Sequence, residues 1–308
     1  MAGAEIVFVH GIAQEQLTAD TLETRWRDQL SGGLRIAGHS QLADRMRDQF
    51  RPDALKCRMA FYGHLFLEPG AQGASDAEGD TANQLAAAWL ANVAARSRYA
   101  EEADDARRAI AGNAPDGRAA QGFGATAGWA IRNLGRVPWF VRPAVGAASF
   151  LKPALVQVTT YLEDRKIRTD ARELVLQTLT PDTQVVIAHS LGSVVAWEAL
   201  HQRTDRPELP LLITIGSPLG LPGLVYPSLW PQPPTFPPKV ARWINIADKD
   251  DFVAAEPDLA PLFPGGQLSG TWTPDNGASP HEAAFYLAKQ MLANAVAEVL
   301  NFRPPREP

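Results

Sequence analysis

One eight-residue segment constrains the fold of this chain more than any other. Residues 185–192 read Val-Val-Ile-Ala-His-Ser-Leu-Gly, so three β-branched apolar residues run into a tight turn with Ser190 at its apex. The apolar stretch that follows at once, residues 193–200, is compatible with a helix. Short apolar strands that alternate with helical segments are typical of a parallel sheet covered on both faces. The segment therefore favours an α/β fold.

The same segment has the features of a nucleophile elbow, a turn that lifts a serine hydroxyl clear of the sheet between a strand and a helix. The residues two before and two after the serine must be small, because strand and helix nearly touch there. Gly192 meets this requirement, and Ala188 is one methyl larger than the usual glycine and still tolerable. A buried turn whose serine makes only local hydrogen bonds would have the same pattern. The two interpretations differ in whether residues that could act with the serine follow in the right order further along the chain.

The apolar pattern predicts the other elements. Further strands are expected at 5–9, 57–62, 211–215 and 240–246, with a weaker candidate at 268–273. Helices are expected at 20–35, at 81–110, two or three times within 125–180, and finally at 280–300, with a loop at 111–124. No strand is convincing between 76 and 180. We therefore expect a single domain over 1–308, with a mostly parallel central sheet flanked by helices and a helical insertion at about 76–180.

Composition excludes several classes of protein. The net charge of −5, with no basic block, gives nucleic-acid binding no electrostatic support. The single cysteine, Cys57, excludes an intramolecular disulfide and disfavours a cysteine-based metal site; we interpret it as a buried apolar residue. The N-terminus enters a strand without a signal-like segment. The most apolar stretch, 128–162, is interrupted by charges and prolines, and its longest uncharged run, 153–162, is about half of the ~20 residues that span a bilayer. We expect a cytoplasmic protein, with at most weak peripheral membrane contact through 128–155.

Three polar residues stand where the strands of such a sheet deliver reactive groups, at their carboxyl ends. Ser190 lies on the turn, Asp251 follows the strand expected at 240–246, and His281 lies in a turn-rich loop before the final helix. A serine hydroxyl becomes a nucleophile when an imidazole takes its proton, and a buried carboxylate holds that imidazole in the right tautomer. Asp248 and Asp250 compete with Asp251 for the acid position, and His281 could instead be an ordinary residue at a helix start. We expect His189 to be structural.

A tetrahedral intermediate also needs donors for its oxyanion. One is expected from the backbone N–H of Leu191, directly after the serine. The other is expected from the N–H of Ile12, because Gly11 lets the loop after the first strand turn toward the serine.

Together, Val-His-Gly-Ile at 9–12, Ala-His-Ser-Leu-Gly at 188–192, an acidic loop and a late histidine resemble the α/β-hydrolase superfamily. The lipase- and esterase-like serine hydrolases are the most similar, including small bacterial lipases with Ala at the first position of the elbow. The resemblance covers 5–12 and roughly 165–300. It implies the α/β-hydrolase fold, a Ser190–Asp251–His281 triad, and Ile12 and Leu191 as oxyanion donors. Asp251-Phe252-Val253 stands where Asp-Pro-Val is commoner in the family.

Two segments are candidates for shaping specificity. Residues 217–238 hold eight prolines, and this rigid apolar loop either forms a wall of the pocket or packs on its own residues. Residues 125–160, with Trp129, Trp139, Phe140 and Phe150, form either a cap over the site or ordinary packing helices. The residues expected to contact a substrate are His10, Tyr62, Leu221, Tyr226 and Trp230.

The expected function is that of a serine hydrolase cleaving carboxylic esters, with apolar acyl groups, through an acyl-enzyme and without a metal or organic cofactor. The expected partner is a small-molecule ester or lipid-like substrate; the oligomeric state stays open. A thioesterase, amidase or acyltransferase would use the same machinery. A non-catalytic binding protein with a hydrolase fold is the alternative from another class.

Overall fold

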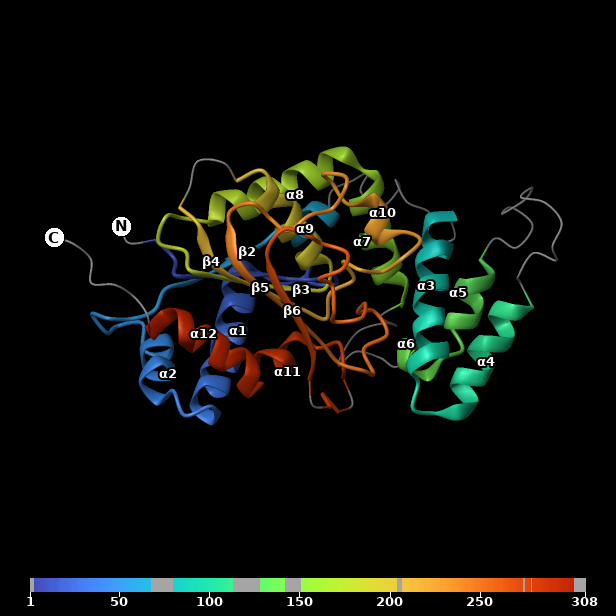
Figure 1. Ribbon diagram of the computed structural model, residues 1–308, viewed down its shortest axis with the longest axis horizontal. Coiled ribbons are helices and arrows are strands. Elements are labelled where there is room, and N and C mark those ends of the chain that lie inside the picture. Colours follow the sequence, from blue (N-terminus) through green and yellow to red (C-terminus); the bar gives the residue numbers. More distant parts are fainter. Residues whose placement is uncertain are drawn as a thin grey trace.

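The computed structural model describes residues 3–67, 80–112, 128–141, 151–203, 207–273, 275–277 and 279–301. Its centre is one six-stranded sheet in the order β2-β1-β3-β4-β5-β6 (Figure 1), and each pair of neighbours is parallel. The strands are β1 (Ile6–Val9), β2 (Cys57–Ala60), β3 (Val185–His189), β4 (Leu209–Ile215), β5 (Val240–Ala247) and β6 (Gln267–Trp272). The expected strands are confirmed, including the weak one at 268–273, and the α/β class with them.

The sheet divides the apolar core into two parts, because successive side chains of a strand point to opposite faces. In β1, Val7 and Val9 belong to one cluster, whereas Ile6 and Phe8 belong to the other. The second cluster is closed by α1 (Ala19–Ile36), α2 (Ser40–Arg47), α11 (Ala283–Leu287) and α12 (Gln290–Asn301), which cover one face in Figure 1. The first is closed by α7 (Leu151–Glu163), α8 (Arg165–Thr178) and α9 (Leu191–His201).

The helix expected at 20–35 is confirmed as α1. It begins after Thr18, whose side chain accepts a hydrogen bond from the N–H of Thr21, and an N-cap of this kind satisfies a backbone donor of the first turn. Its buried residues Leu22, Trp26, Leu30 and Leu34 recur every four positions and face the sheet. Cys57 is buried on β2, as expected for an apolar residue, and burial raises the pKa of its thiol to about 12.

Between β2 and β3 the described residues are helical, as expected for the insertion. The elements are η1 (Gly63–Phe66), α3 (Asp80–Arg96), α4 (Ala100–Ala111), α5 (Trp129–Leu134), α6 (Pro138–Val141), α7 and α8. In Figure 1, α3, α4 and α5 stand together beyond the end of the sheet. The helix expected over 81–110 is two helices, because the chain turns at 97–99, and the described part of 125–180 holds four helices where two or three were expected. The expected loop at 111–124 begins with the last residue of α4 and Gly112, and its residues 113–124 fall outside the described residues, as do Phe150 and the side chain of Trp139.

The prediction of one final helix over 280–300 was wrong, since the chain forms α11 and α12 with a break at 288–289. At this break α11 packs closely on α1: a Cβ on Gly33 of α1 would lie 2.7 Å from the carbonyl oxygen of Leu287. Apolar spacing continues across the break, so periodicity could not reveal it. None of the described helices is both long and apolar enough to cross a bilayer.

Candidate active site

The turn from β3 into α9 holds Ser190 in a rare backbone conformation. Its φ of 52° and ψ of −130° lie in a region that residues with a Cβ seldom adopt. The N–H of Ser190 donates to the carbonyl of Ile215 on β4 at 3.1 Å, and its carbonyl accepts from the N–H of Ser193 at 2.9 Å. The turn is therefore held from both sides, and the strain is maintained by the structure around it.

Two glycines explain how the loop after β1 can reach this turn. A Cβ on Gly192 would lie 2.1 Å from the carbonyl oxygen of His10 and 2.6 Å from that of Val9. A Cβ on Gly11 would lie 2.8 Å from the Cβ of Ser190. The loop after β1 and the start of α9 thus touch backbone to backbone, and neither position accepts a larger residue without a shift.

The structure brings Ser190, His281 and Asp251 together although they come from three separate loops. The Oγ of Ser190 lies 2.9 Å from Nε2 of His281. Nδ1 of the same ring lies 2.9 and 2.8 Å from the two carboxylate oxygens of Asp251. The carboxylate only accepts, so the ring proton belongs on Nδ1, which leaves Nε2 free to accept from the serine hydroxyl. This is the arrangement in which an imidazole acts as the base for a serine.

Asp251 is fully buried and surrounded by donors. Besides His281, the hydroxyl of Tyr286 donates to Oδ2 at 2.8 Å, and the N–H groups of Val253 and Ala254 donate to Oδ1 at 3.1 and 3.2 Å. Burial opposes ionisation, but the His281 ring and the Tyr286 hydroxyl outweigh it, so the pKa of this carboxyl lies below its usual value. Asp251 is held as a carboxylate.

The two competing acids have other partners. Asp248 accepts from the N–H groups of Asp250 and Asn276 at 2.8 and 2.6 Å, and burial raises its pKa. Asp250 forms an ion pair with Arg98 at 2.8 Å. The geometry therefore joins only Asp251 of these three to His281 within the described contacts. Tyr286 was missed by the sequence analysis, because an aromatic residue in a helix is most simply interpreted as core.

The loop after β1, which carries the expected second oxyanion donor Ile12, is held by the insertion. Ala13, directly after Ile12, has a φ of 57°, and its N–H donates to the side-chain oxygen of Gln157 on α7 at 2.8 Å. The amide nitrogen of Gln157 donates in turn to Glu15 at 2.7 Å. Gln157 therefore fixes the peptide next to Ile12, although nothing in the sequence links two residues so far apart. Leu191 is the first residue of α9, so its N–H lies at a helix N-terminus, where negative charge is stabilised.

His10 and Tyr62, which were expected to contact a substrate, are buried and bound to each other. The N–H of Tyr62 donates to Nε2 of His10 at 3.1 Å, the Tyr62 hydroxyl donates to the His10 carbonyl at 2.6 Å, and the rings stack at 4.2 Å. Burial lowers the pKa of His10 to about 4. The pair shapes the oxyanion loop from behind, and direct contact with a substrate stays a prediction.

His189 lies beside the triad without joining it. Its Nε2 is 2.8 Å from the carbonyl oxygen of His281, so a neutral ring that donates there holds the histidine loop. Burial and the neighbouring His281 lower the pKa of His189 to about 3. This arrangement fits the structural role expected for it.

The three expected pocket residues of the proline-rich loop have contacts of their own. Leu221 is buried, the Tyr226 hydroxyl donates to the carbonyl of Leu262 at 3.0 Å, and Trp230 is half exposed with the Arg172 guanidinium 5.0 Å from its ring centre. The loop thus packs on its own residues and on the insertion, and a role in substrate binding stays a prediction.

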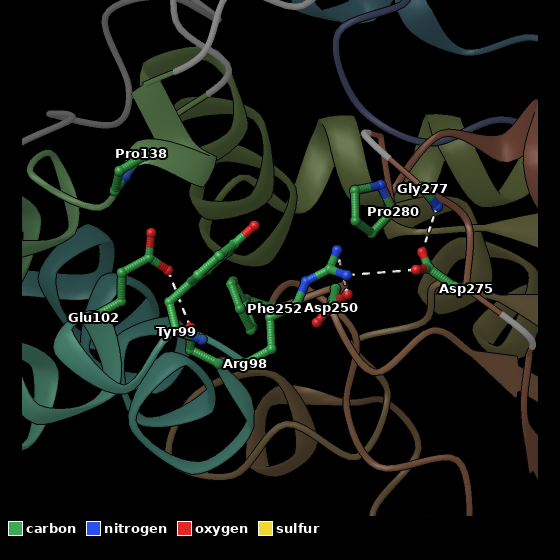
Figure 2. A pocket seen from close by; sticks show the side chains of 10 residues that line it. Arg98, Tyr99, Glu102, Pro138, Asp250, Phe252, Asp275, Gly277 and Pro280 are labelled. Atoms are coloured by element: carbon green, nitrogen blue, oxygen red, sulfur yellow. Dashed lines mark hydrogen bonds and ion pairs between the residues drawn. The ribbon is translucent and has the colours of Figure 1, made fainter.

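A cavity of about 300 Å³ lies where the acid and histidine loops meet the insertion (Figure 2). Asp250, Phe252 and Pro280, each next in sequence to a triad residue, form part of its lining, and Tyr99 and Pro138 of the insertion form another part. The Ser190 side of the triad is covered, since Ser190 is 1% exposed. The cavity is therefore next to the two supporting loops and not above the serine.

In the described part of the chain no group of three or more His, Cys, Asp or Glu side chains is arranged to hold a metal ion. Comparison of the chain with protein-family models, curated proteins and solved structures finds no match. The functional argument therefore depends on the geometry of the site.

Proposed function

We propose that this protein is a serine hydrolase of the α/β-hydrolase type, which cleaves carboxylic esters through an acyl-enzyme. The observation that carries the proposal is the unbroken hydrogen-bonded chain from Ser190 Oγ through the His281 ring to the Asp251 carboxylate, with distances of 2.8–2.9 Å. Two further features support the same assignment. The serine has a strained positive φ, and the site loops all follow the carboxyl ends of strands in one parallel sheet.

In the proposed reaction the Ser190 oxygen attacks the ester carbonyl as Nε2 of His281 takes its proton. Asp251 keeps the ring oriented and stabilises the imidazolium that forms. The N–H groups of Leu191 and Ile12 donate to the oxyanion of the tetrahedral intermediate. His281 then returns the proton to the leaving alcohol, and a water molecule, activated by the same ring, releases the acid.

The substrate class proposed is an uncharged small-molecule ester, including lipid-like esters with an apolar acyl group. Apolar side chains in the lining of the neighbouring cavity support it, because apolar walls favour uncharged ligands; they are Tyr99, Pro138, Phe252 and Pro280. Phe140 stacks on Trp89 at 5.6 Å and lies 6.5 Å from Phe252, so aromatic side chains of the insertion pack next to the acid loop.

The test is covalent labelling of the folded chain with a fluorophosphonate, followed by intact mass measurement. We expect one adduct per chain, its complete loss in Ser190→Ala, and its retention in Ser31→Ala, which removes an equally buried hydroxyl on α1. Hydrolysis of p-nitrophenyl esters should disappear with the adduct. Absence of labelling in the folded wild-type chain would refute the proposal in favour of a binding protein, and turnover confined to thioesters or amides would refute the ester assignment.

A further inference from the structure

The helical insertion holds the backbone of the acid loop, residues 251–254. From α3, the side-chain amide of Asn92 donates to the carbonyls of Phe252 and Ala254 at 2.7 and 3.2 Å. One turn later, Nη2 of Arg96 donates to the carbonyls of Asp251 and Ala254 at 3.0 and 2.7 Å. Four hydrogen bonds from one helix therefore end on a single four-residue turn.

The direction of the peptides in that turn explains why such donors are needed. The N–H groups of Val253 and Ala254 point inward to the Asp251 carboxylate, so the carbonyls of Phe252 and Val253, in the same two peptides, point away from it. The Asp251 carbonyl accepts within the turn from the N–H of Ala254 at 3.2 Å. Buried carbonyls need donors. Side chains on α3 supply the donor for Phe252 and add donors for Asp251 and Ala254, and in doing so they fix the turn that carries the Asp251 carboxylate.

Arg96 binds the main chain of the acid loop, and the hydrogen bonds of its Nη2 end on carbonyl groups and not on a carboxylate. It is partly buried, its guanidinium lies 5.7 Å from the centre of the Trp272 ring, and burial lowers its pKa. Among the neighbouring charges, Asp251 raises the pKa of Arg96 the most and so opposes part of this lowering. The guanidinium thus stands behind the triad carboxylate, bound to the main chain that carries it.

We propose that Arg96 is a positioning residue for the reaction, acting through Asp251, and that α3 is a fixed part of the catalytic site. This inference depends on the proposed serine hydrolase activity. When the guanidinium is removed, the carbonyls of Asp251 and Ala254 each lose one of two donors, and the loop relaxes together with its carboxylate. His281 follows, because both carboxylate oxygens bind its ring. A displacement near 1 Å at a reacting group costs roughly 100-fold in rate.

The experiment compares Arg96→Met with Arg96→Lys, which keeps the charge and a donor, and with Arg45→Met. Arg45 is a matched control on α2, outside the site loops and the insertion: it is partly buried, and its Nε donates to the carbonyl of Asp53 at 2.9 Å. We measure kcat and KM for a p-nitrophenyl ester and the rate of fluorophosphonate labelling. For Arg96→Met we expect kcat and labelling rate to fall about 10- to 100-fold with KM within about threefold. Arg96→Lys should recover part of this loss, and Arg45→Met should keep kcat within about threefold.

A kcat of Arg96→Met within threefold of the wild type, a loss confined to KM, or an equal loss in Arg45→Met overturns the inference. Urea unfolding establishes that each variant is folded, and if Arg96→Met is not, Arg96→Gln is judged by the same criterion. Failure of the function itself is distinct, because the wild-type chain would then neither label nor cleave esters.

Discussion

The conformation of Ser190 makes a quantitative prediction about stability that is independent of catalysis. Replacing Ser190 by alanine or by glycine removes the same hydroxyl and the same hydrogen bond to His281, so those losses cancel between the two variants. What differs is the backbone. At φ 52° and ψ −130° alanine retains the strain of its Cβ, whereas glycine adopts this region freely.

The expected difference follows from two opposing terms. Strain at such a residue costs roughly 1–3 kcal/mol, whereas the greater freedom of an unfolded glycine costs roughly 0.5–1 kcal/mol. Ser190→Gly should therefore be more stable than Ser190→Ala by up to about 2.5 kcal/mol, and by about 1 kcal/mol at the middle of the two ranges. With an unfolding entropy of roughly 2.1 cal/mol/K per residue over 308 residues, this middle value raises the midpoint of thermal unfolding by about 2 °C.

Urea unfolding of both inactive variants gives this difference as a shift in midpoint at constant slope. The control is the same pair of substitutions at Ser31, in the interior of α1, where glycine should be less stable than alanine by about 1 kcal/mol. Opposite signs at the two serines support a strained elbow. If glycine is the less stable residue at both positions, Ser190 is not strained and the turn is an ordinary one.

Three further predictions concern the site and its supports. Asp251→Asn should lower kcat about 10⁴-fold with little change in KM, because an amide neither enforces the required tautomer of His281 nor stabilises its charged form. Steady-state kinetics with a p-nitrophenyl ester measures kcat and KM. A kcat equal to that of the wild type would contradict the assignment of Asp251. In the folded chain the pKa values of His10 and His189 are about 4 and about 3, below the unfolded value of 6.5. At a pH between the folded and unfolded pKa values, only the unfolded chain protonates these two rings. The contribution of the two neutral rings to the stability of the fold is complete above pH 6.5 and is lost as the pH falls toward 4 and 3. The urea midpoint should therefore drop between pH 7 and 5, and it should drop less in His189→Asn. A urea midpoint that does not change with pH would count against buried neutral rings. Gly192→Ala places a Cβ 2.1 Å from a backbone oxygen and should destabilise the fold by about 1–3 kcal/mol, which the urea midpoint checks; a neutral result would mean that the loop after β1 moves freely.

The sequence predicted those features that depend on local pattern. Apolar runs identified the six strands, and the turn at Ser190 was recognisable because strand, small residues and helix follow one another directly. Local pattern failed where packing decides. Apolar spacing continues through the break between α11 and α12, where Gly33 of α1 packs closely on Leu287. Three aspartates within four positions were equivalent in sequence, and the contact of Asp251 with the His281 ring distinguishes it.

The supports of the site were beyond sequence reasoning for the same reason. Gln157 and Arg96 lie in a helical stretch whose polar residues are most simply interpreted as solvated. Their partners at Ala13 and Asp251 are more than 140 positions away along the chain, with separations of 144 and 155. No periodicity records such a contact, because it exists only once α3 and α7 have packed beside the sheet.

These supports favour α3 and α7 as fixed parts of the proposed site over a mobile cap above it. A mobile lid needs few and weak contacts with the site it covers, since lids belong to the least stable parts of a fold. Here α3 binds the acid loop, α7 binds the loop that carries Ile12, and α8 is joined to α9 by Arg168, which binds the fully buried Glu198. Each contact ends on a loop or helix that the proposed reaction uses, and a buried ion pair is costly to break. Motion that admits a substrate is therefore expected elsewhere than in α3, α7 and α8, whose displacement would disperse the groups that the reaction needs.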